Sequence, residues 1–207
     1  AAHVHADYAA LVADPAVEAV YVSTPHPFHA EHAILAIRAG KPVLVEKPAG
    51  LTAAQVAGLV ELAALSGVLF MEAYMYRCHP QIARLLEILK SGEIGTPRHI
   101  RTSFGFTAGF DPSSRLYDRA LGGGGILDVG GYPVSLARLV AGAAAGQPFA
   151  DPVTVKGSGI LGKSGVDEVA YGILTFAGGF TAEISCAIAR NMDNNAVIFG
   201  DKGRIEL

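Results

Sequence analysis

A lysine, an aspartate and a tyrosine could share one reaction in this 207-residue chain. Lys47 stands in the stretch VEKP, directly after a hydrophobic run, and Asp128 and Tyr132 stand at i and i+4 in GGGGILDVGGYP. Residues at i and i+4 share a face if the stretch is helical. An ammonium group near a tyrosine stabilises the phenolate and lowers the phenol's usual pKa of about 10. Such a tyrosine can exchange a proton with a hydroxyl or carbonyl oxygen, so the three residues predict acid–base chemistry at a carbonyl.

Each of these residues also has a plain structural interpretation. Lys47 could be a solvated loop lysine, Asp128 a carboxylate in the first turn of a helix, and Tyr132 a packed ring. The residue types alone leave both interpretations open. The choice between the two interpretations therefore depends on the helices and strands that position the three side chains.

A strand–helix–strand–helix–strand pattern fills the first third of the chain. Short β-branched and aromatic runs predict strands, and apolar residues at helical spacing predict helices. The helix over 51–67 is the clearest, because Thr52 and Gln55 match a capping box and Gly67 marks its end. The alternation predicts two βαβ units and a parallel sheet. The predicted strands span 18–23, 42–45 and 68–73, and the other helix spans 30–40.

The carboxyl ends of these strands are rich in polar residues. Right-handed crossovers make the three strands point the same way, so their ends share one edge of the sheet. Ligands of open α/β sheets bind at that edge. The three ends are Ser23–Pro27, Glu46–Pro48 and Glu72–Pro80, which places Lys47 at the predicted ligand edge.

The pattern changes after Pro80. Residues 126–142 are predicted to be helical, weakened by Gly130, Gly131 and Pro133. From about Pro152 the chain alternates strands with turns, and Ala177–Gly179 is a hairpin signal. An amphipathic helix is predicted over 80–92, a strand over 98–106, and a long glycine-rich loop that could act as a lid over 108–125.

These elements predict an α/β fold in which a partial Rossmann-type parallel sheet is followed by an α+β domain with a largely antiparallel open sheet. We expect residues 1–75 to be the C-terminal part of a dinucleotide-binding domain. Residues 76–207 are expected to be an incomplete substrate-binding and dimerisation domain. The apolar strands after Pro152 carry few charges, so a homodimer or higher homo-oligomer through that sheet is expected.

Composition excludes several classes of protein. The chain is 51% hydrophobic and 17% charged, with a formal net charge of −3, and it has no Lys/Arg block for nucleic acid or anionic membranes. No apolar run in the sequence is long enough to cross a membrane. The two cysteines form no disulfide framework, which suits a reducing cytoplasm.

Two motif matches are expected to be chance. GSGILGKS at 157–164 has the spelling of a phosphate-binding loop, but Gly165 and a strand-like run follow it where the motif needs a helix. His26, His29 and His32 are spaced i, i+3, i+6, which is a poor arrangement for a metal on one helix face. We expect structural histidines at a strand-to-helix turn and no metal site.

Four stretches taken in order carry a resemblance. They are STPHPFHAEHAILAIRAGKPVLVEKP, the VEKP that ends it, EAYMYRCHPQ and GGGGILDVGGYPVSLAR. Together they resemble the glucose–fructose oxidoreductase, inositol dehydrogenase and rhizopine-catabolism (Gfo/Idh/MocA) family. Within it, the tyrosine of GGYP and the AYMYRCHP segment are similar to the dimeric dihydrodiol dehydrogenase and D-xylose dehydrogenase branch. The resemblance covers nearly the whole chain.

The resemblance implies reversible hydride transfer between NAD or NADP and a sugar, polyol or cyclic diol. It implies that Tyr132 is the acid/base, that Lys47 lies beside the nicotinamide, and that Asp128 is the acidic residue one turn before Tyr132. Substrate is implied to contact Lys47, His79, Asp128 and Tyr132. The implied cofactor contacts are Ser23, Thr24, Pro25, His26, His29, Glu46, Lys47, Pro48 and Arg77.

The family also implies a strand and a G-x-G-x-x-G turn before Ala1, and more sheet after Leu207, so we expect this chain to be the middle of a longer protein. The choice between NAD and NADP is implied to lie in that earlier segment. Two alternatives remain open on the same fold: a non-catalytic NAD(P)-binding sensor or co-repressor, and a structural pseudo-enzyme fragment.

Overall fold

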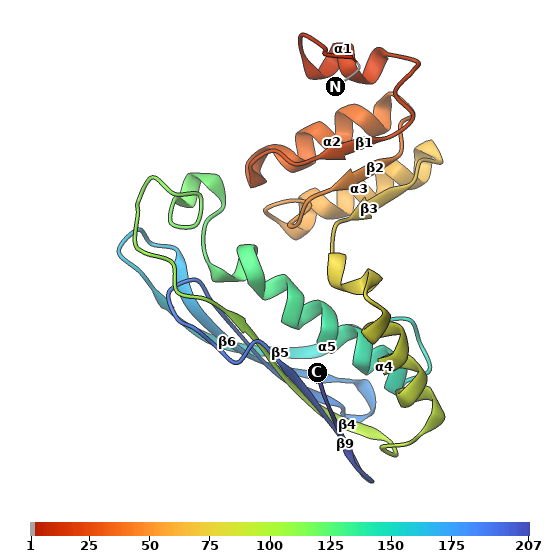
Figure 1. Cartoon of the computed structure of the whole chain (residues 1–207), viewed down its shortest axis with the longest axis vertical. Helices are drawn as coiled ribbons and strands as arrows, with labels where there is room; N and C mark the ends of the chain where they lie inside the picture. The colour runs from red at the N-terminus through yellow and green to blue at the C-terminus, as the bar shows by residue number, and fades with distance from the viewer. Residues whose placement is uncertain (1–2) are drawn as a thin grey trace. The chain divides into compact units, whose positions relative to one another are not determined.

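The computed structural model describes residues 3–207, and the chain divides into two compact units (Figure 1). The first unit contains the residues up to Tyr74 together with Ala120–Gly122. The second contains Met75–Arg119 and Gly123–Leu207. The division after Tyr74 lies beside the predicted domain boundary, and the roles predicted for the two parts remain predictions.

The first unit is a three-stranded parallel sheet with helices, as the alternating pattern predicts. The strands run in the order β1-β2-β3, and both neighbouring pairs are parallel. All three strands are shorter than the predicted runs. The elements are α1 (Tyr8–Ala13), β1 (Val20–Val22), η1 (His26–Phe28), α2 (His29–Arg38), β2 (Val43–Val45), α3 (Ala53–Ser66) and β3 (Phe70–Glu72).

One face of this sheet makes the core of the first unit. Val43 and Val45 of β2 are buried and pack with Ile37 of α2 and Leu59 of α3. Successive side chains of a strand point to opposite faces, so the residue between the two valines, Leu44, faces the other way and is exposed. The apolar alternation therefore fixes which face of the sheet receives the helices.

The caps of α3 confirm the predicted helix boundaries. The Thr52 hydroxyl accepts a hydrogen bond from the Gln55 backbone N–H, and the Gln55 side chain accepts one from the N–H of Leu51. Gly67 ends the helix with φ of 61°, a left-handed conformation that glycine adopts without steric cost. This helix begins six residues after Lys47, so its start is fixed close to the predicted ligand edge.

The second unit is a six-stranded sheet with two helices, α4 and α5. The strand order is β5-β6-β7-β4-β8-β9, and every neighbouring pair is antiparallel except β4 and β7. This confirms a largely antiparallel sheet, and the Ala177–Gly179 turn joins β6 to β7 as predicted. The elements are η2 (Met75–Cys78), α4 (Pro80–Ser91), β4 (Pro97–Gly105), η4 (Ile126–Gly130), α5 (Gly131–Ala144), β5 (Pro152–Leu161), β6 (Asp167–Phe176), β7 (Thr181–Ala187), β8 (Ala196–Gly200) and β9 (Arg204–Glu206). The short helix η3 (Arg119–Leu121) has its first residue in the second unit and its other two in the first.

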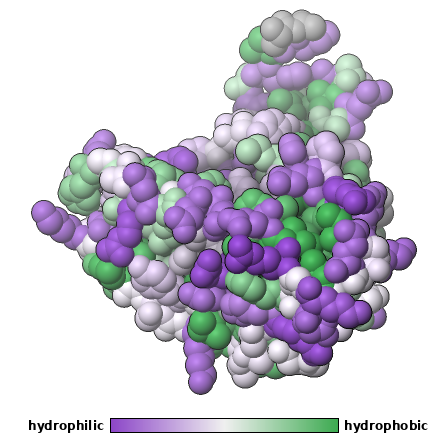
Figure 2. Space-filling view, turned by 60° about the horizontal axis from the view of Figure 1, so that its bottom comes forward, coloured by the Kyte–Doolittle hydropathy of each residue, from purple (hydrophilic) through white to green (hydrophobic). Residues whose placement is uncertain are grey.

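Both helices cover the same face of this sheet (Figure 1). Leu85 of α4 and Val140 of α5 are buried against Ile100 of β4 and Ile198 of β8. On the opposite face, Ile173 of β6 is about half exposed. Figure 2 shows a surface on which hydrophilic residues predominate and hydrophobic residues gather in small patches.

The helix that follows the glycine run begins as a π-helical turn, Ile126–Gly130, and continues as α5. Its start is tied to the sheet, because the Asp167 carboxylate of β6 accepts a hydrogen bond of 2.7 Å from the Ile126 N–H. Gly124 has φ of 111°, and a Cβ there would collide with that carboxylate. A Cβ at Gly130 would lie 3.0 Å from the Cys186 sulfur. Because these glycines have no side chain, the start of the helix packs directly against the sheet. This is the helix that the sequence predicts to be weakened by glycine.

The phosphate-loop spelling at 157–164 is a chance match. Gly157–Leu161 belong to β5 and the next residues form the turn into β6, so no helix follows the motif. Within the described residues 3–207, no helix combines the length and apolar character needed to cross a bilayer.

The contact between Gly130 and Cys186 yields a chemical test. Burial raises the pKa of the Cys186 thiol to about 12, and the thiolate is the form that reacts with alkylating agents. We expect iodoacetamide to label exposed Cys78 in the native protein at neutral pH and to leave Cys186 unlabelled until denaturant unfolds the chain. Mass spectrometry of tryptic peptides measures both rates.

The Cys78→Ser variant is the control, and its native form should take up no label. Native labelling of Cys186 at a rate comparable with that of Cys78 would show that the contact between η4 and β7 does not shield the Cys186 thiol from the reagent.

Candidate active site

The predicted ligand edge of the first unit is formed by the residues that follow β1, β2 and β3. Lys47 is the second residue after β2 and is half-buried, and its peptide bond to Pro48 is cis. Ser23 and Pro25, which follow β1, are exposed. The parallel sheet thus places the turn that carries Lys47 next to the exposed residues predicted to face a cofactor.

Glu46 is partly engaged by the neighbouring strand. The Tyr21 hydroxyl of β1 donates a hydrogen bond of 2.5 Å to the Glu46 carboxylate. This bond raises the pKa of the Tyr21 phenol above its usual value, because losing the phenolic proton would remove it. The carboxylate also accepts from the backbone N–H of Lys47 at 3.3 Å. Glu46 therefore stays at the strand end, where a ligand hydroxyl could reach its remaining acceptor sites.

The three histidines after β1 lie in structural positions. His26 and His29 are buried, and the His26 Nδ1 lies 3.1 Å from the Gly122 carbonyl oxygen. His32 bonds through Nδ1 to the Thr24 hydroxyl at 3.1 Å. Among the described residues, no group of three His, Cys, Asp or Glu side chains is placed to hold a metal ion.

His29 differs from the position that the resemblance implies. Its side chain is 1% exposed, and its two ring nitrogens lie 2.7 Å from the Pro48 carbonyl oxygen and 2.5 Å from the Thr24 carbonyl oxygen. Both polar atoms of the ring are thus occupied by backbone groups. These contacts hold the two turns together, and the cofactor contact that the resemblance implies for His29 remains a prediction.

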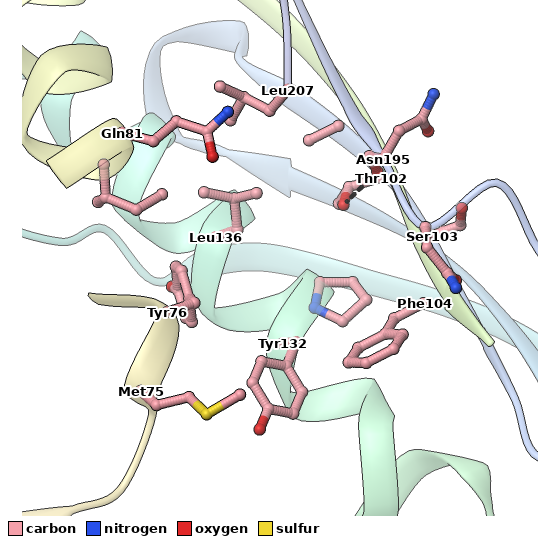
Figure 3. Close-up of a pocket in the computed structure, with 14 residues that line it drawn as sticks. Met75, Tyr76, Gln81, Thr102, Ser103, Phe104, Tyr132, Leu136, Asn195 and Leu207 are labelled. Atoms are coloured by element: carbon pink, nitrogen blue, oxygen red, sulfur yellow. Dashed lines mark hydrogen bonds between the residues drawn. The ribbon is translucent and has the colours of Figure 1, made fainter. Parts of the chain in front are cut away.

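The second unit holds a pocket of about 340 Å³ beside Tyr132 (Figure 3). Tyr132 of α5 packs edge-on against Phe104 of β4, with ring centroids 5.2 Å apart. The ring of Tyr76 from η2 lies 6.1 Å from the Tyr132 ring, and its hydroxyl lies 2.8 Å from the Ser135 hydroxyl. Burial raises the pKa of the Tyr76 phenol, so it stays protonated at neutral pH.

Polar side chains line more than one side of this pocket: Gln81 lies beside Leu207, and Ser103 and Asn195 lie across from it (Figure 3). The Tyr132 hydroxyl is directed away from Leu136 and Leu207. Thr102 is buried and donates to the Asn195 carbonyl oxygen at 3.0 Å, so it is already engaged. The other residues that line the pocket are Met75, Ile82, Pro133, Asn194 and Ala196.

Asp128 is buried and paired with a cation. Its carboxylate accepts a hydrogen bond of 2.8 Å from the Arg115 guanidinium, whose side chain is half exposed. A guanidinium is charged at any physiological pH, so this partner favours the ionised form of the carboxylate. The predicted lid loop contributes Arg115, which gives the loop a contact with the helix that carries Tyr132.

Two further predicted residues have structural contacts. The Arg77 guanidinium lies over the Phe149 ring, 4.5 Å from its centroid. His79 is exposed and caps α4, because its Nδ1 accepts from the Gln81 N–H at 3.2 Å. These contacts account for both side chains within the second unit, and their roles toward cofactor and substrate remain predictions.

Sequence reasoning missed Tyr76, Phe104 and Arg115. The tyrosines of AYMYRCHP are a signal for the first, because a second ring at the end of a predicted strand suits a ligand site. Phe104 and Arg115 lie far from Tyr132 in sequence and carry no local signal. Only the strand register and the path of the loop bring them to α5.

Two family models match the chain. Residues 1–74 match the oxidoreductase family with an NAD-binding Rossmann fold, and residues 82–206 match the GFO/IDH/MocA C-terminal domain.

Curated and solved relatives agree with these matches. Trans-1,2-dihydrobenzene-1,2-diol dehydrogenase of Mus musculus is 36% identical over 203 residues, which are 98% of this chain and 59% of that protein. Aldose-aldose oxidoreductase from Caulobacter crescentus, solved with glycerol, aligns with a TM-score of 0.83 at 30% identity, covering 96% of this chain and 58% of that one. The 3-ketoreductase KijD10 of Actinomadura kijaniata, solved with NADP and TDP-benzene, aligns with a TM-score of 0.80 at 32% identity, covering 97% and 59%.

The chain therefore spans about three fifths of the length of the relatives that it matches. The two family models together cover almost all of it, in the order that the parallel sheet and the antiparallel sheet follow. The chain belongs to the Gfo/Idh/MocA family of oxidoreductases.

Proposed function

We propose that the full-length protein is an NAD(P)-dependent oxidoreductase that transfers a hydride between the nicotinamide and a CH–OH group of a sugar, polyol or cyclic diol. One observation carries the proposal: Lys47 lies at the carboxyl end of the middle strand of a parallel sheet, inside the segment that matches the NAD-binding model. That edge is where open α/β sheets bind nucleotides.

The residues at that edge suit a nicotinamide riboside. Glu46 offers acceptor sites for ribose hydroxyl groups, and Lys47 offers a cationic donor. Exposed Ser23 and Pro25 would border the same ligand. When bound, the nicotinamide supplies the acceptor or donor of the hydride.

In the direction of alcohol oxidation, Tyr132 takes the hydroxyl proton as the carbon loses its hydride. Lys47 stabilises the phenolate and the developing alkoxide through its positive charge. Asp128, held as a carboxylate by Arg115, keeps a negative charge near the start of the helix that carries Tyr132. In the reverse direction Tyr132 returns the proton to the carbonyl oxygen.

The pocket beside Tyr132 supports a compact substrate with both apolar and polar faces. Three aromatic rings, from Tyr76, Phe104 and Tyr132, can pack against the C–H face of a small ring. A volume of about 340 Å³ is near the lower end of the range for small-molecule sites. The dihydrobenzenediol named for the mouse relative is a small ring with an apolar C–H face and two hydroxyl groups, which agrees with this character.

We place the protein in the cytoplasm, because both cysteines, Cys78 and Cys186, are free thiols, which a reducing compartment maintains.

The proton step should reveal the role of Tyr132. We expect Tyr132→Phe in the full-length protein to lower kcat by about a hundred- to ten-thousandfold, the usual contribution of a general acid–base. Its Kd for NAD(P)H should barely change, because the ring still packs on Phe104. Steady-state kinetics with a panel of diols and sugars, and calorimetric titration of the nucleotides, measure the two effects.

The exposed tyrosine of α1 provides the control, and Tyr8→Phe should leave kcat unchanged. Lys47→Met should lower both kcat and nucleotide affinity. A Tyr132→Phe enzyme with near-wild-type kcat would show that Tyr132 only packs. Tight nucleotide binding without turnover of any substrate would instead favour a sensor or co-repressor.

We further propose that the protein is a homodimer formed through the face of the second sheet that α4 and α5 leave uncovered. Ile173 of β6 lies on that face in register with Lys156 of β5, Glu183 of β7 and Arg101 of β4. These four cross-strand neighbours combine an exposed apolar side chain with charged side chains of both signs. A second copy of the same face can pair such charges.

Ile173→Lys should therefore weaken the dimer, because it would replace an apolar contact of the interface with a charged side chain that must lose its water. Light scattering of the full-length protein should give a dimeric mass for the wild type and a lower mass for Ile173→Lys at micromolar concentration. Val60→Lys, at an exposed position of α3, should stay dimeric. A monomeric wild type, or an unchanged Ile173→Lys dimer, would refute this interface.

A further inference from the structure

The peptide group that follows Pro48 is held from both sides by side chains. Its carbonyl oxygen lies 2.7 Å from the His29 Nδ1, and its N–H, which belongs to Ala49, donates to the Glu72 carboxylate at 2.8 Å. His29 is the first residue of α2, and Glu72 is the last residue of β3. Two elements far apart in the sequence thus hold one peptide group, one residue beyond Lys47.

His29 also links this group to the turn after β1. Its second ring nitrogen lies 2.5 Å from the Thr24 carbonyl oxygen. Carbonyl oxygens only accept hydrogen bonds, so the ring makes both bonds at once when it donates from both nitrogens. His26 lies beside it, with ring centroids 5.6 Å apart, and Glu72 is the acidic group whose charge acts on it.

The Glu72 carboxylate is more than half buried, and burial raises its pKa. The hydrogen bond from the Ala49 N–H opposes that rise, and the electrostatic influence of His29 acts in the same direction. A donor on the carbonyl and an anion on the N–H polarise the peptide group in the same direction, so each bond strengthens the other.

We propose that His29 and Glu72 are positioning residues that clamp the Pro48–Ala49 peptide group and so fix the turn that carries Lys47. This role rests on the proposed function, because it matters only if Lys47 acts on cofactor and substrate. It joins the ends of all three parallel strands through side chains: Thr24 after β1, Pro48 and Ala49 after β2, and Glu72 at the end of β3.

Hydrogen exchange of the Ala49 amide in the full-length, unliganded protein tests the clamp without any measurement of activity. We expect slow exchange in the wild type and acceleration of about tenfold or more in Glu72→Ala, which removes a hydrogen bond to a charged group. Exchange should also accelerate in His29→Ala, although His29 does not touch that N–H. Glu72→Gln should restore much of the protection, because its amide oxygen can still accept.

The matched controls are Glu61→Ala and His3→Ala, at exposed positions, and neither should change the Ala49 rate. A wild-type Ala49 amide that exchanges fast, or a rate that His29→Ala leaves unchanged, would overturn the clamp.

Measurements of turnover then test whether the clamp serves Lys47. Glu72→Ala should lower kcat in the wild-type background and have little further effect in the Lys47→Met background. An equal loss in both backgrounds would show that Glu72 does not act through Lys47. An inactive wild type with a protected Ala49 amide would contradict the proposed function and leave the clamp standing.

Discussion

Where a parallel strand ends, its backbone leaves the sheet, and its buried peptide groups need new hydrogen-bond partners. That requirement organises the first unit. After β2 the partners are the His29 ring and the Glu72 carboxylate, which come from the elements on either side. The same turn carries Lys47. The hydrogen bonds that satisfy the backbone of this turn therefore also fix the position of the lysine. The bonds that complete the fold are also the ones that prepare the ligand edge.

The second unit solves a different problem, which is to bring a helix close to a sheet. Gly124, just before η4, leaves room for the Asp167 carboxylate, which accepts a hydrogen bond from the Ile126 N–H. Gly130, at the end of η4, allows the backbone to approach Cys186. The helix then continues into α5 and presents Tyr132 to Phe104 of the sheet. The pocket beside Tyr132 is therefore a product of how the helix starts rather than of the pocket residues alone.

The sequence predicts most helices and strands of both units, though not α1 (Tyr8–Ala13), because their signals are local. Apolar alternation, the Thr52 cap and the glycines at helix ends each act within a few residues, and the structure has strands and helices at those places. The clamp on the Pro48–Ala49 peptide and the pairing of Arg115 with Asp128 could not be predicted in this way. Both join residues that only tertiary structure brings together, and buried hydrogen-bond partners leave no periodicity. His29 illustrates the difference. Its position after the first strand could be predicted from the sequence, but its burial and the contacts of both ring nitrogens with backbone carbonyl oxygens could not.

The proposed function requires that Lys47 and Tyr132 act in one chemical step. A double-mutant cycle on kcat with Lys47→Met and Tyr132→Phe in the full-length protein tests it most directly. Residues that act as a unit give strongly non-additive losses. If Lys47 and Tyr132 act together, the double variant should be scarcely slower than the slower single variant. Losses in free energy of activation that simply add would show that the two residues act independently, and would contradict that requirement.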